Sequence, residues 1–260
     1  MSKLRDAIYG FAIGDALGVP YEFKSFGSFT CEGMVGFGTH FQKKGTFSDD
    51  TSMTLATADS IRATGTVDPD DIMKRFLSWL NEGKYSPDGK VFDIGNTTFR
   101  ALSLYDGTTP FCGGRNESDN GNGSLMRILP LAFVRDVTDE QIAAVSSLTH
   151  AHEMSIDYCI RYVRLAEALI RGEDVTFPYE EPVRASGFVS DTFNAVMYSL
   201  ATTASYRECV LKAVNLGDDT DTVAAIAGGL AGIKYGFEAI PEDWLDALRG
   251  KEIIEACLFQ

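Results

Sequence analysis

The N-terminal stretch LRDAIYGFA, residues 4–12, carries apolar side chains at positions 4, 7, 8, 11 and 12. This spacing places them on one stripe of an α-helix. Gly10, Gly14 and Gly18 then recur at intervals of four residues, which lets a second backbone approach closely at some cost in helix propensity. The opening of the chain therefore predicts a helix that packs tightly against another segment.

The helical period continues through the chain, and segments with strand-like alternation are nearly absent. Asp68 and Pro69 are typical of a helix N-cap and first turn, and apolar positions continue that helix to Leu80. The best strand candidate, residues 29–37, is interrupted by two glycines and is interpreted as a loop. No composition shift marks a linker, so we expect one all-α domain over residues 1–260. Further helices are expected at residues 51–63, 96–104, 124–133, 139–148, 154–170, 190–200, 205–214 and 220–237.

Composition and charge exclude several classes of protein. Of the 260 residues, 45% are hydrophobic and 23% charged, which argues against overall disorder. The formal net charge of −14 argues against nucleic acid and anionic membranes as general partners. The apolar run at residues 223–233 is too short to span a bilayer. Five scattered cysteines, without a Cys-x-x-Cys pair or a secretion signal, predict reduced thiols and a cytoplasmic location.

Two acidic clusters give the first chemical signal, SDDT at residues 48–51 and DDTDT at residues 218–222, each just before an expected helix. Either cluster alone is more simply interpreted as a helix N-cap. An N-cap needs one such residue, however, and adjacent carboxylates repel one another unless a cation lies between them. Oxygen-only ligands suit magnesium, manganese or calcium. Together the clusters therefore predict a shared site for two hard cations. No strand precedes either cluster, which argues against an Asp-x-Asp phosphotransferase site.

The segment DNGNGSLMR, residues 119–127, places a glycine-rich loop at the expected start of a helix. Exposed amides there could seat an anion such as a diphosphate, although Asn-Gly pairs also make ordinary turns. His150 and His152 precede the next helix but are two residues apart, so they do not share a helix face. We expect His152 to contact the ligand and His150 to be a packed or surface residue.

Glu22 and Asp93 each lie among apolar and aromatic neighbours. An acid in such surroundings can have a raised pKa and carry a proton during catalysis. A surface acid or a helix cap remains the simpler interpretation of either residue taken alone. Asp15, inside the first glycine-rich helix, is expected to make a structural hydrogen bond.

Six motifs in this order resemble the ADP-ribosylglycohydrolases, the family of dinitrogenase reductase activating glycohydrolase and the ADP-ribosylhydrolases. The resemblance extends from residue 4 to about residue 248. The motifs are GDALG (14–18), SDDT (48–51), GNT (95–97), GNGSLMR (121–127), THAH (149–152) and GDDTDT (217–222).

The resemblance implies an all-α orthogonal helical bundle with a binuclear magnesium or manganese site in a central cleft. Asp218 stands where relatives often have glycine, and whether it coordinates is left open. Glu22 and Asp93 match acids with proposed catalytic roles. The metal ligands would be Ser48, Asp49, Asp50, Asp219, Asp221 and Thr222. The substrate-binding residues would be Asn122, Gly123, Ser124, Met126, His152, Gly187 and Phe188.

The activity implied by the resemblance is hydrolysis of the bond between the ribose anomeric carbon of ADP-ribose and an acceptor, most often an arginine guanidino nitrogen. Such cleavage passes through a cationic, oxocarbenium-like sugar. The partner would be an ADP-ribosylated protein or a small-molecule ADP-ribose conjugate, and nucleic acid only as an ADP-ribosylated end. Alternative leaving groups are serine, O-acetyl-ADP-ribose, poly-ADP-ribose, a nucleic-acid end or a free guanidine compound. Loss of turnover would leave a non-catalytic ADP-ribose-binding protein or a structural protein, and the intact clusters argue against both.

Overall fold

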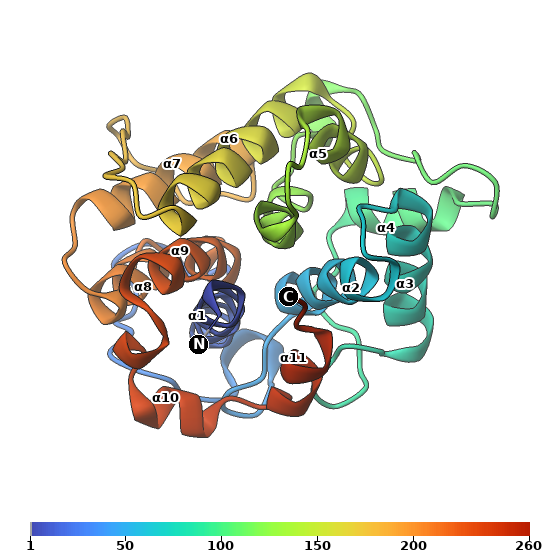
Figure 1. The fold of residues 1–260 in the computed structure, drawn as a ribbon. Coiled ribbons are helices and arrows are strands. Elements are labelled where there is room, and N and C mark those ends of the chain that lie inside the picture. Colours follow the sequence, from blue (N-terminus) through green and yellow to red (C-terminus); the bar gives the residue numbers. More distant parts are fainter. Residues whose placement is uncertain (1) are drawn as a thin grey trace.

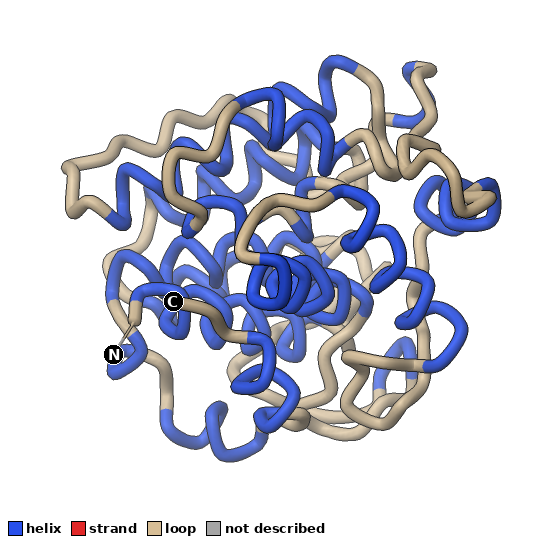
Figure 2. The backbone as a smooth tube through the Cα atoms, turned by 45° about the vertical axis from the view of Figure 1, so that its right-hand side comes forward, coloured by secondary structure: helices blue, strands red, loops and turns tan. Residues whose placement is uncertain are grey.

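The computed structural model describes residues 2–260 as a single all-helical domain (Figure 1), which confirms the predicted fold class. No strand forms within these residues, and the backbone consists of helices and loops (Figure 2). The α-helices are α1 (Lys3–Gly18), α2 (Asp49–Thr64), α3 (Pro69–Glu82), α4 (Asn96–Leu104), α5 (Asp139–Ser146), α6 (Glu153–Ile170), α7 (Val189–Ala201), α8 (Tyr206–Val214), α9 (Thr220–Tyr235), α10 (Glu242–Ala247) and α11 (Lys251–Cys257). Short 3-10 helices are η1 (Gly38–His40), η2 (Glu117–Asp119), η3 (Leu125–Arg127), η4 (Leu129–Phe133) and η5 (Phe237–Ala239).

Helices α1 and α9 form the centre of the molecule and pack along their whole lengths. The predicted close approach occurs here, because a Cβ at Gly14 would overlap the backbone carbonyl of Ala224. Gly10 faces Gly228 in the same way. The two helices run antiparallel, so the C-terminal end of α1 at Gly18 lies beside the first turn of α9.

The other helices surround this central pair (Figure 1). Helix α8 packs on α9, α3 packs on α2, and α7 and α6 also contact α9. The first three turns of α2 are buried on every side, since α2 lies between the centre and the outer helices α3 and α11. The N-terminal ends of α2 and α9 therefore both open near the end of α1, inside the protein.

The expected helix at residues 124–133 is wrong in detail, because the segment forms the two 3-10 helices η3 and η4. Pro130 explains the break, since it has no N–H and its ring would clash with the Met126 carbonyl in a continuous α-helix. That carbonyl accepts a hydrogen bond from the Thr54 hydroxyl instead, at 2.9 Å. Helices α10 and α11 were not predicted because six and seven residues are too short to show a helical period.

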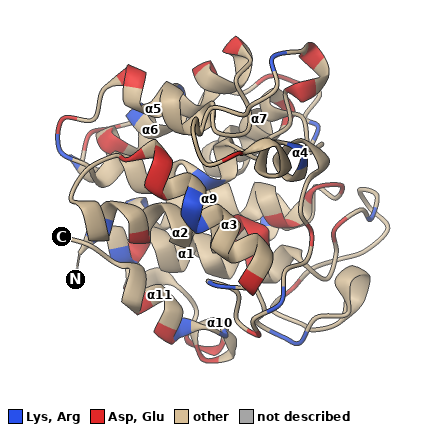
Figure 3. Cartoon of the chain, turned by 90° about the vertical axis from the view of Figure 1, so that its right-hand side faces the viewer, with Lys and Arg blue, Asp and Glu red and all other residues tan. Residues whose placement is uncertain are grey.

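Lysine, arginine, aspartate and glutamate residues are spread over the outer helices and loops (Figure 3). All five cysteines are free thiols, as predicted. Among residues 2–260, no helix has the length and apolar character needed to cross a lipid bilayer.

Candidate metal and substrate site

The first acidic cluster is held in place by Asp15 of α1. The Asp15 carboxylate accepts hydrogen bonds from the backbone N–H of Ser48 at 2.9 Å and of Thr51 at 3.0 Å. It also accepts from the Thr51 hydroxyl at 2.6 Å. Asp15 therefore fixes the first turn of α2, which confirms its expected structural role.

The second cluster forms the start of α9, with Asp219 at the N-cap position. The Thr220 hydroxyl donates to the Gly18 carbonyl at 2.8 Å, which ties this turn to the end of α1. The Asp219 carboxylate accepts from the Asn122 side chain at 2.7 Å. Its side chain makes no capping hydrogen bond to α9. Asp219 is therefore not explained by a helix-capping role.

The two clusters meet, although they lie far apart in the sequence. The Thr222 hydroxyl donates to the Asp50 carboxylate at 3.3 Å. Asp15, Asp50 and Asp221 each have a carboxylate oxygen within 4.8 Å of the others, and so do Glu22, Asp219 and Asp221. Asp221 belongs to both groups and joins them into one acidic centre.

The chemistry of this centre fits divalent cations. One carboxylate oxygen on each of Asp50, Asp219 and Asp221 is buried and has no hydrogen-bond partner among residues 2–260. Burial, followed by repulsion between neighbouring carboxylates, raises the pKa of Asp49, Asp50 and Asp221 well above the ordinary range. Buried polar atoms are normally paired, and hard cations prefer oxygen ligands. The donor atoms of this centre are therefore suited to hard cations.

A cavity of about 370 Å³ opens beside the acidic centre, which is within the range of small-molecule sites. We call one set of its lining residues the acidic wall: Glu22, Asp49, Asp93, Asp219 and Thr222. We call a second set the glycine wall: Gly121, Asn122, Gly123, Met126 and His150. The two walls join where Asn122 donates to Asp219. Ser48, Asp50 and Asp221 are buried next to the acidic wall without lining the cavity.

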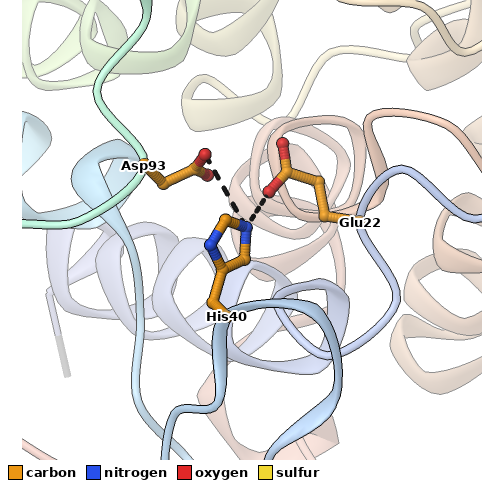
Figure 4. A group of neighbouring side chains, drawn as sticks. All are labelled: Glu22, His40 and Asp93. Carbon is orange, nitrogen blue, oxygen red and sulfur yellow. Dashed lines mark hydrogen bonds and ion pairs between the residues drawn. The ribbon is translucent and has the colours of Figure 1, made fainter.

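Glu22 and Asp93 approach each other through His40, as Figure 4 shows. The His40 Nε2 atom is hydrogen bonded to the Glu22 carboxylate and lies 3.7 Å from Asp93 Oδ1. Burial, followed by repulsion from Asp219, raises the pKa of Glu22 to about 8. Burial, followed by repulsion from Glu22, raises the pKa of Asp93 to about 8. The predicted pair of acids with raised pKa values is therefore present at the cavity.

His40 cannot be recognised as a site residue from the sequence. It is a lone histidine in a glycine-rich loop, 18 residues beyond Glu22, and no motif surrounds it. The loop returns because the Thr39 hydroxyl donates to the Glu22 carbonyl at 2.7 Å and the Thr39 N–H donates to the Pro20 carbonyl. Only this tertiary contact brings His40 to the two acids.

The glycine wall is formed by a loop that enters the three-residue η3, and not by the start of an α-helix. The expected contribution of a helix dipole is therefore absent from this part of the chain. Backbone contacts hold the loop, with Asn122 N–H donating to the Gly187 carbonyl at 3.0 Å. A Cβ at Gly123 would lie only 2.8 Å from His150 Cε1 and Thr98 Oγ1, so any larger residue there would force a neighbour to shift.

The structure shows which of the two histidines reaches the cavity, which their spacing in the sequence does not. His150 is buried and lines the cavity, and burial followed by repulsion from Arg127 lowers its pKa to about 3. His152 is the N-cap of α6, where its Nδ1 accepts from the Met154 N–H at 3.1 Å. It does not line the cavity. His150 therefore occupies the position that the sequence analysis gave to His152.

The remaining predicted substrate residues lie at different depths. Ser124 is fully buried, and its hydroxyl accepts from Ser146 at 3.0 Å away from the cavity. Gly187 lines the cavity, and Phe188 follows it at the N-cap of α7 with 39% of its surface exposed. The backbone of Phe188 also pairs with that of Gly121, which places this residue beside the glycine wall.

The fold is all-helical, and two carboxylate clusters meet beside a cavity lined by glycines. These features define the class of protein. The chain belongs to the ADP-ribosylglycohydrolase family, whose sequence model matches residues 1–183 and 175–259. It is a hydrolase of that family, as the motif resemblance predicts.

Two curated relatives and one solved structure extend this assignment. The chain is 33% identical to ADP-ribosylarginine hydrolase Tri1 of Serratia proteamaculans, over 98% of this chain and 77% of that protein. It is 34% identical to the ADP-ribosyl-[dinitrogen reductase] glycohydrolase of Rhodospirillum rubrum, over 93% and 88%. A structure titled ADP-ribosylglycohydrolase-related protein complex superposes with a TM-score of 0.83 at 30% identity, covering 98% of this chain and 95% of that one.

Proposed function

We propose that the protein is a metal-dependent hydrolase that releases ADP-ribose from ADP-ribosylated arginine on a protein. The observation that carries the proposal is the convergence of the two acidic clusters. They place three unpaired, buried carboxylate oxygens beside a cavity large enough for part of a nucleotide sugar. The names of the two curated relatives, one acting on ADP-ribosylarginine and one on ADP-ribosyl-[dinitrogen reductase], support this choice of bond.

The acidic centre would hold two divalent cations, Mg²⁺ or Mn²⁺, through Ser48, Asp49, Asp50, Asp219, Asp221 and Thr222. When bound, such ions supply Lewis-acid chemistry that orients hydroxyls and water. Asp15 contributes by holding the first turn of α2 in position, and Asn122 contributes by orienting the Asp219 carboxylate. Asp218 has a left-handed backbone with φ of 60°, and its N–H and carbonyl bond to Lys24 and Phe23. Its role in our proposal is to shape this turn.

The ADP-ribose would lie along both walls of the cavity. The proposed substrate contacts are the cavity-lining Asn122, Gly123, Met126, Gly187 and His150, together with Phe188 next to Gly187. Ser124 and His152 do not line the cavity, so we propose that they support the loop and α6 from behind. The ribose lies toward the acidic wall, because its hydroxyls are suited to metal and carboxylate partners. The diphosphate lies toward the glycine wall, away from the carboxylates that would repel it.

Proton transfer is assigned to Glu22 and Asp93. Burial beside other carboxylates raises the pKa of each to about 8, so the pair can hold one protonated and one ionised carboxyl at neutral pH. One of them donates a proton to the departing guanidino nitrogen as the anomeric C–N bond breaks. The other accepts a proton from the water that attacks the cationic sugar. His40 lies between them and holds their side chains in register.

The decisive experiment measures free ADP-ribose released from a panel of conjugates, with Mg²⁺ and with Mn²⁺. The panel contains ADP-ribosylarginine protein, ADP-ribosylserine peptide, O-acetyl-ADP-ribose, poly-ADP-ribose, an ADP-ribosylated nucleic-acid end and ADP-ribosylguanidine. We expect preferential release from arginine, and loss of release with a chelator. Preference for another conjugate would replace the acceptor. Binding of ADP-ribose without any release would show a non-catalytic ADP-ribose-binding protein.

The five free thiols fit a reducing compartment, and we place the enzyme in the cytoplasm.

A further inference from the structure

Arg127 is a buried cation directly behind the glycine wall. It is fully buried in η3, and its guanidinium lies 4.7 Å from the centre of the Phe76 ring. Within residues 2–260 it forms no ion pair with a carboxylate, and its Nε has no hydrogen-bond partner. Burial lowers its pKa to about 10, so it remains charged at neutral pH. A buried charge without a counter-ion is costly and calls for a functional reason.

The Arg127 guanidinium begins a chain of hydrogen bonds that ends at the cavity. Its Nη2 donates to the Thr149 hydroxyl oxygen at 2.6 Å. The same oxygen lies 2.7 Å from Nδ1 of His150. Arginine can only donate, so the Thr149 oxygen accepts from it and has its own hydrogen free to give.

The hydrogen positions in this chain follow from counting donors and acceptors. The Thr149 side chain is fully buried, and among the described residues its only hydrogen-bond partners are Arg127 and His150. If His150 Nδ1 carried the hydrogen, the Thr149 hydroxyl hydrogen would be buried without an acceptor. The satisfied arrangement makes Nδ1 an acceptor. The single ring hydrogen of neutral His150 is then on Nε2.

The Nε2 atom of His150 faces Gly121 and Gly123. A Cβ built on Gly121 would lie 3.5 Å from Nε2, and one on Gly123 would lie 3.3 Å from it. No protein atom within residues 2–260 is recorded as accepting a hydrogen bond from Nε2, and His150 lines the cavity. Its hydrogen is therefore directed at whatever occupies the space beside these two glycines.

We propose that Arg127 is a positioning residue that acts through Thr149 to hold His150 with its hydrogen on Nε2, so that His150 donates to an anionic group of the ligand. The proposal rests on the proposed function only in taking that anion to be the diphosphate of ADP-ribose. The arrangement also explains why Arg127 has no carboxylate partner. An ion pair would cancel the positive charge that Arg127 places behind the glycine wall.

The test compares Thr149→Val, which removes the hydroxyl at constant shape, with Thr149→Ser, which keeps it. Nitrogen-15 NMR of the histidine side chains reads the tautomer directly, and the chain has only three histidines to assign. The samples contain Mg²⁺, because Mn²⁺ would broaden the signals. Calorimetry measures binding of ADP-ribose and, separately, of Mg²⁺. Thr57→Val is the matched control, because that buried hydroxyl donates only to the Met53 carbonyl of its own helix.

In the wild type, Thr149→Ser and Thr57→Val, we expect His150 with its hydrogen on Nε2. In Thr149→Val we expect a mixture of both tautomers and about tenfold weaker ADP-ribose binding, with Mg²⁺ affinity unchanged. Arg127→Met should act like Thr149→Val where it folds, and the Thr149 pair decides the question where it does not. Wild-type His150 with its hydrogen on Nδ1, or Thr149→Val equal to Thr57→Val in tautomer and affinity, would overturn the proposal.

The Thr149 experiment and the ADP-ribose release assay can fail independently of each other. If arginine conjugates are not cleaved but ADP-ribose binds and follows the Thr149 series, the function fails and the positioning role stands. If arginine conjugates are cleaved and the tautomer ignores Thr149, the positioning role fails alone. Failure of the wild type to bind ADP-ribose would overturn the donor role of His150.

Discussion

The acidic wall and the glycine wall enclose the same cavity but are built differently. The acidic wall depends on the first turns of α2 and α9, two buried sixteen-residue helices locked to α1. The glycine wall is a loop held by backbone bonds, by one buried arginine and by the fit of His150 against two glycines. The acidic wall has carboxylates in excess and the glycine wall has one positive charge behind it. The acidic wall is therefore suited to bind cations, and the glycine wall is suited to bind an anion.

The largest expected effect comes from the acidic centre. Asp50→Asn should abolish cation binding and lower turnover by more than about 100-fold, the scale already reached when only an outer-shell partner is lost. Because one of several repelling buried charges disappears, the metal-free variant should melt at a higher temperature than the metal-free wild type. Calorimetry with Mn²⁺ and thermal melting in chelator measure the two effects. Unchanged Mn²⁺ affinity would contradict the assignment of this ligand, and Asp221→Asn provides an independent repeat.

The second-largest effect on turnover should come from Glu22 and Asp93, the two acids of the acidic wall that contact His40. Asp93→Asn and Glu22→Gln should each lower kcat by about 10²–10⁴-fold, the usual contribution of a general acid or base. Both variants keep the side-chain shape, so Mn²⁺ affinity should change little. Steady-state release of ADP-ribose gives kcat, and calorimetry checks the metal. Wild-type turnover in either variant would remove that residue from the mechanism.

A substitution in the glycine wall should change KM and leave metal binding intact. Gly123→Ala puts a methyl group 2.8 Å from His150 Cε1 and Thr98 Oγ1, so the loop or these side chains must shift. We expect KM for the ADP-ribosyl substrate to rise about tenfold, equivalent to ~1.4 kcal/mol of lost binding, while Mn²⁺ affinity is retained. Gly33→Ala is the matched control, because its Cβ meets only the Trp244 side chain at an ordinary 3.5 Å. Equal KM values in the two variants would mean that the glycine wall does not contact substrate.

The two walls also differ in how far the sequence predicts them. The two clusters of the acidic centre can be predicted because each is continuous in sequence and starts a long helix. The glycine triplet of α1 even predicts the close helix contact that joins them, with α9 as the partner found in the structure. The glycine wall depends on tertiary contacts that have no period. A spacing of two residues cannot say which of His150 and His152 reaches the cavity, and Pro130 breaks the helix expected after the loop.

His40 marks the limit of sequence reasoning at this site. Its neighbours Glu22 and Asp93 could be proposed one at a time, as acids in apolar surroundings. Their contact through His40 requires the loop after α1 to fold back, and that return is fixed by single hydrogen bonds rather than by a pattern. The burial that raises the pKa of both acids is likewise a tertiary property.

The smallest expected effect concerns the stability of the metal-free protein. Folding raises the pKa of Glu22 from 4.5 to about 8 and that of Asp93 from 3.8 to about 8. A raised folded-state pKa gives stability that is complete below the unfolded pKa and is lost as pH rises through the folded pKa. The metal-free protein should therefore melt at a higher temperature at pH 5.5 than at pH 8. Thermal melting in chelator across this range measures the difference.

Saturating cation should reverse that pH trend, because it compensates the carboxylates that repel one another at high pH. At a hundredfold excess over Kd, binding adds ~2.7 kcal/mol of stability, which corresponds to roughly 5–10 °C in Tm for a chain of this size. The gain should be larger at pH 8 than at pH 5.5, where protons compete for the same oxygens. Glu22→Gln should flatten the pH trend of the metal-free protein. A gain that is equal at both pH values would mean that the bound ions do not contact the acidic wall.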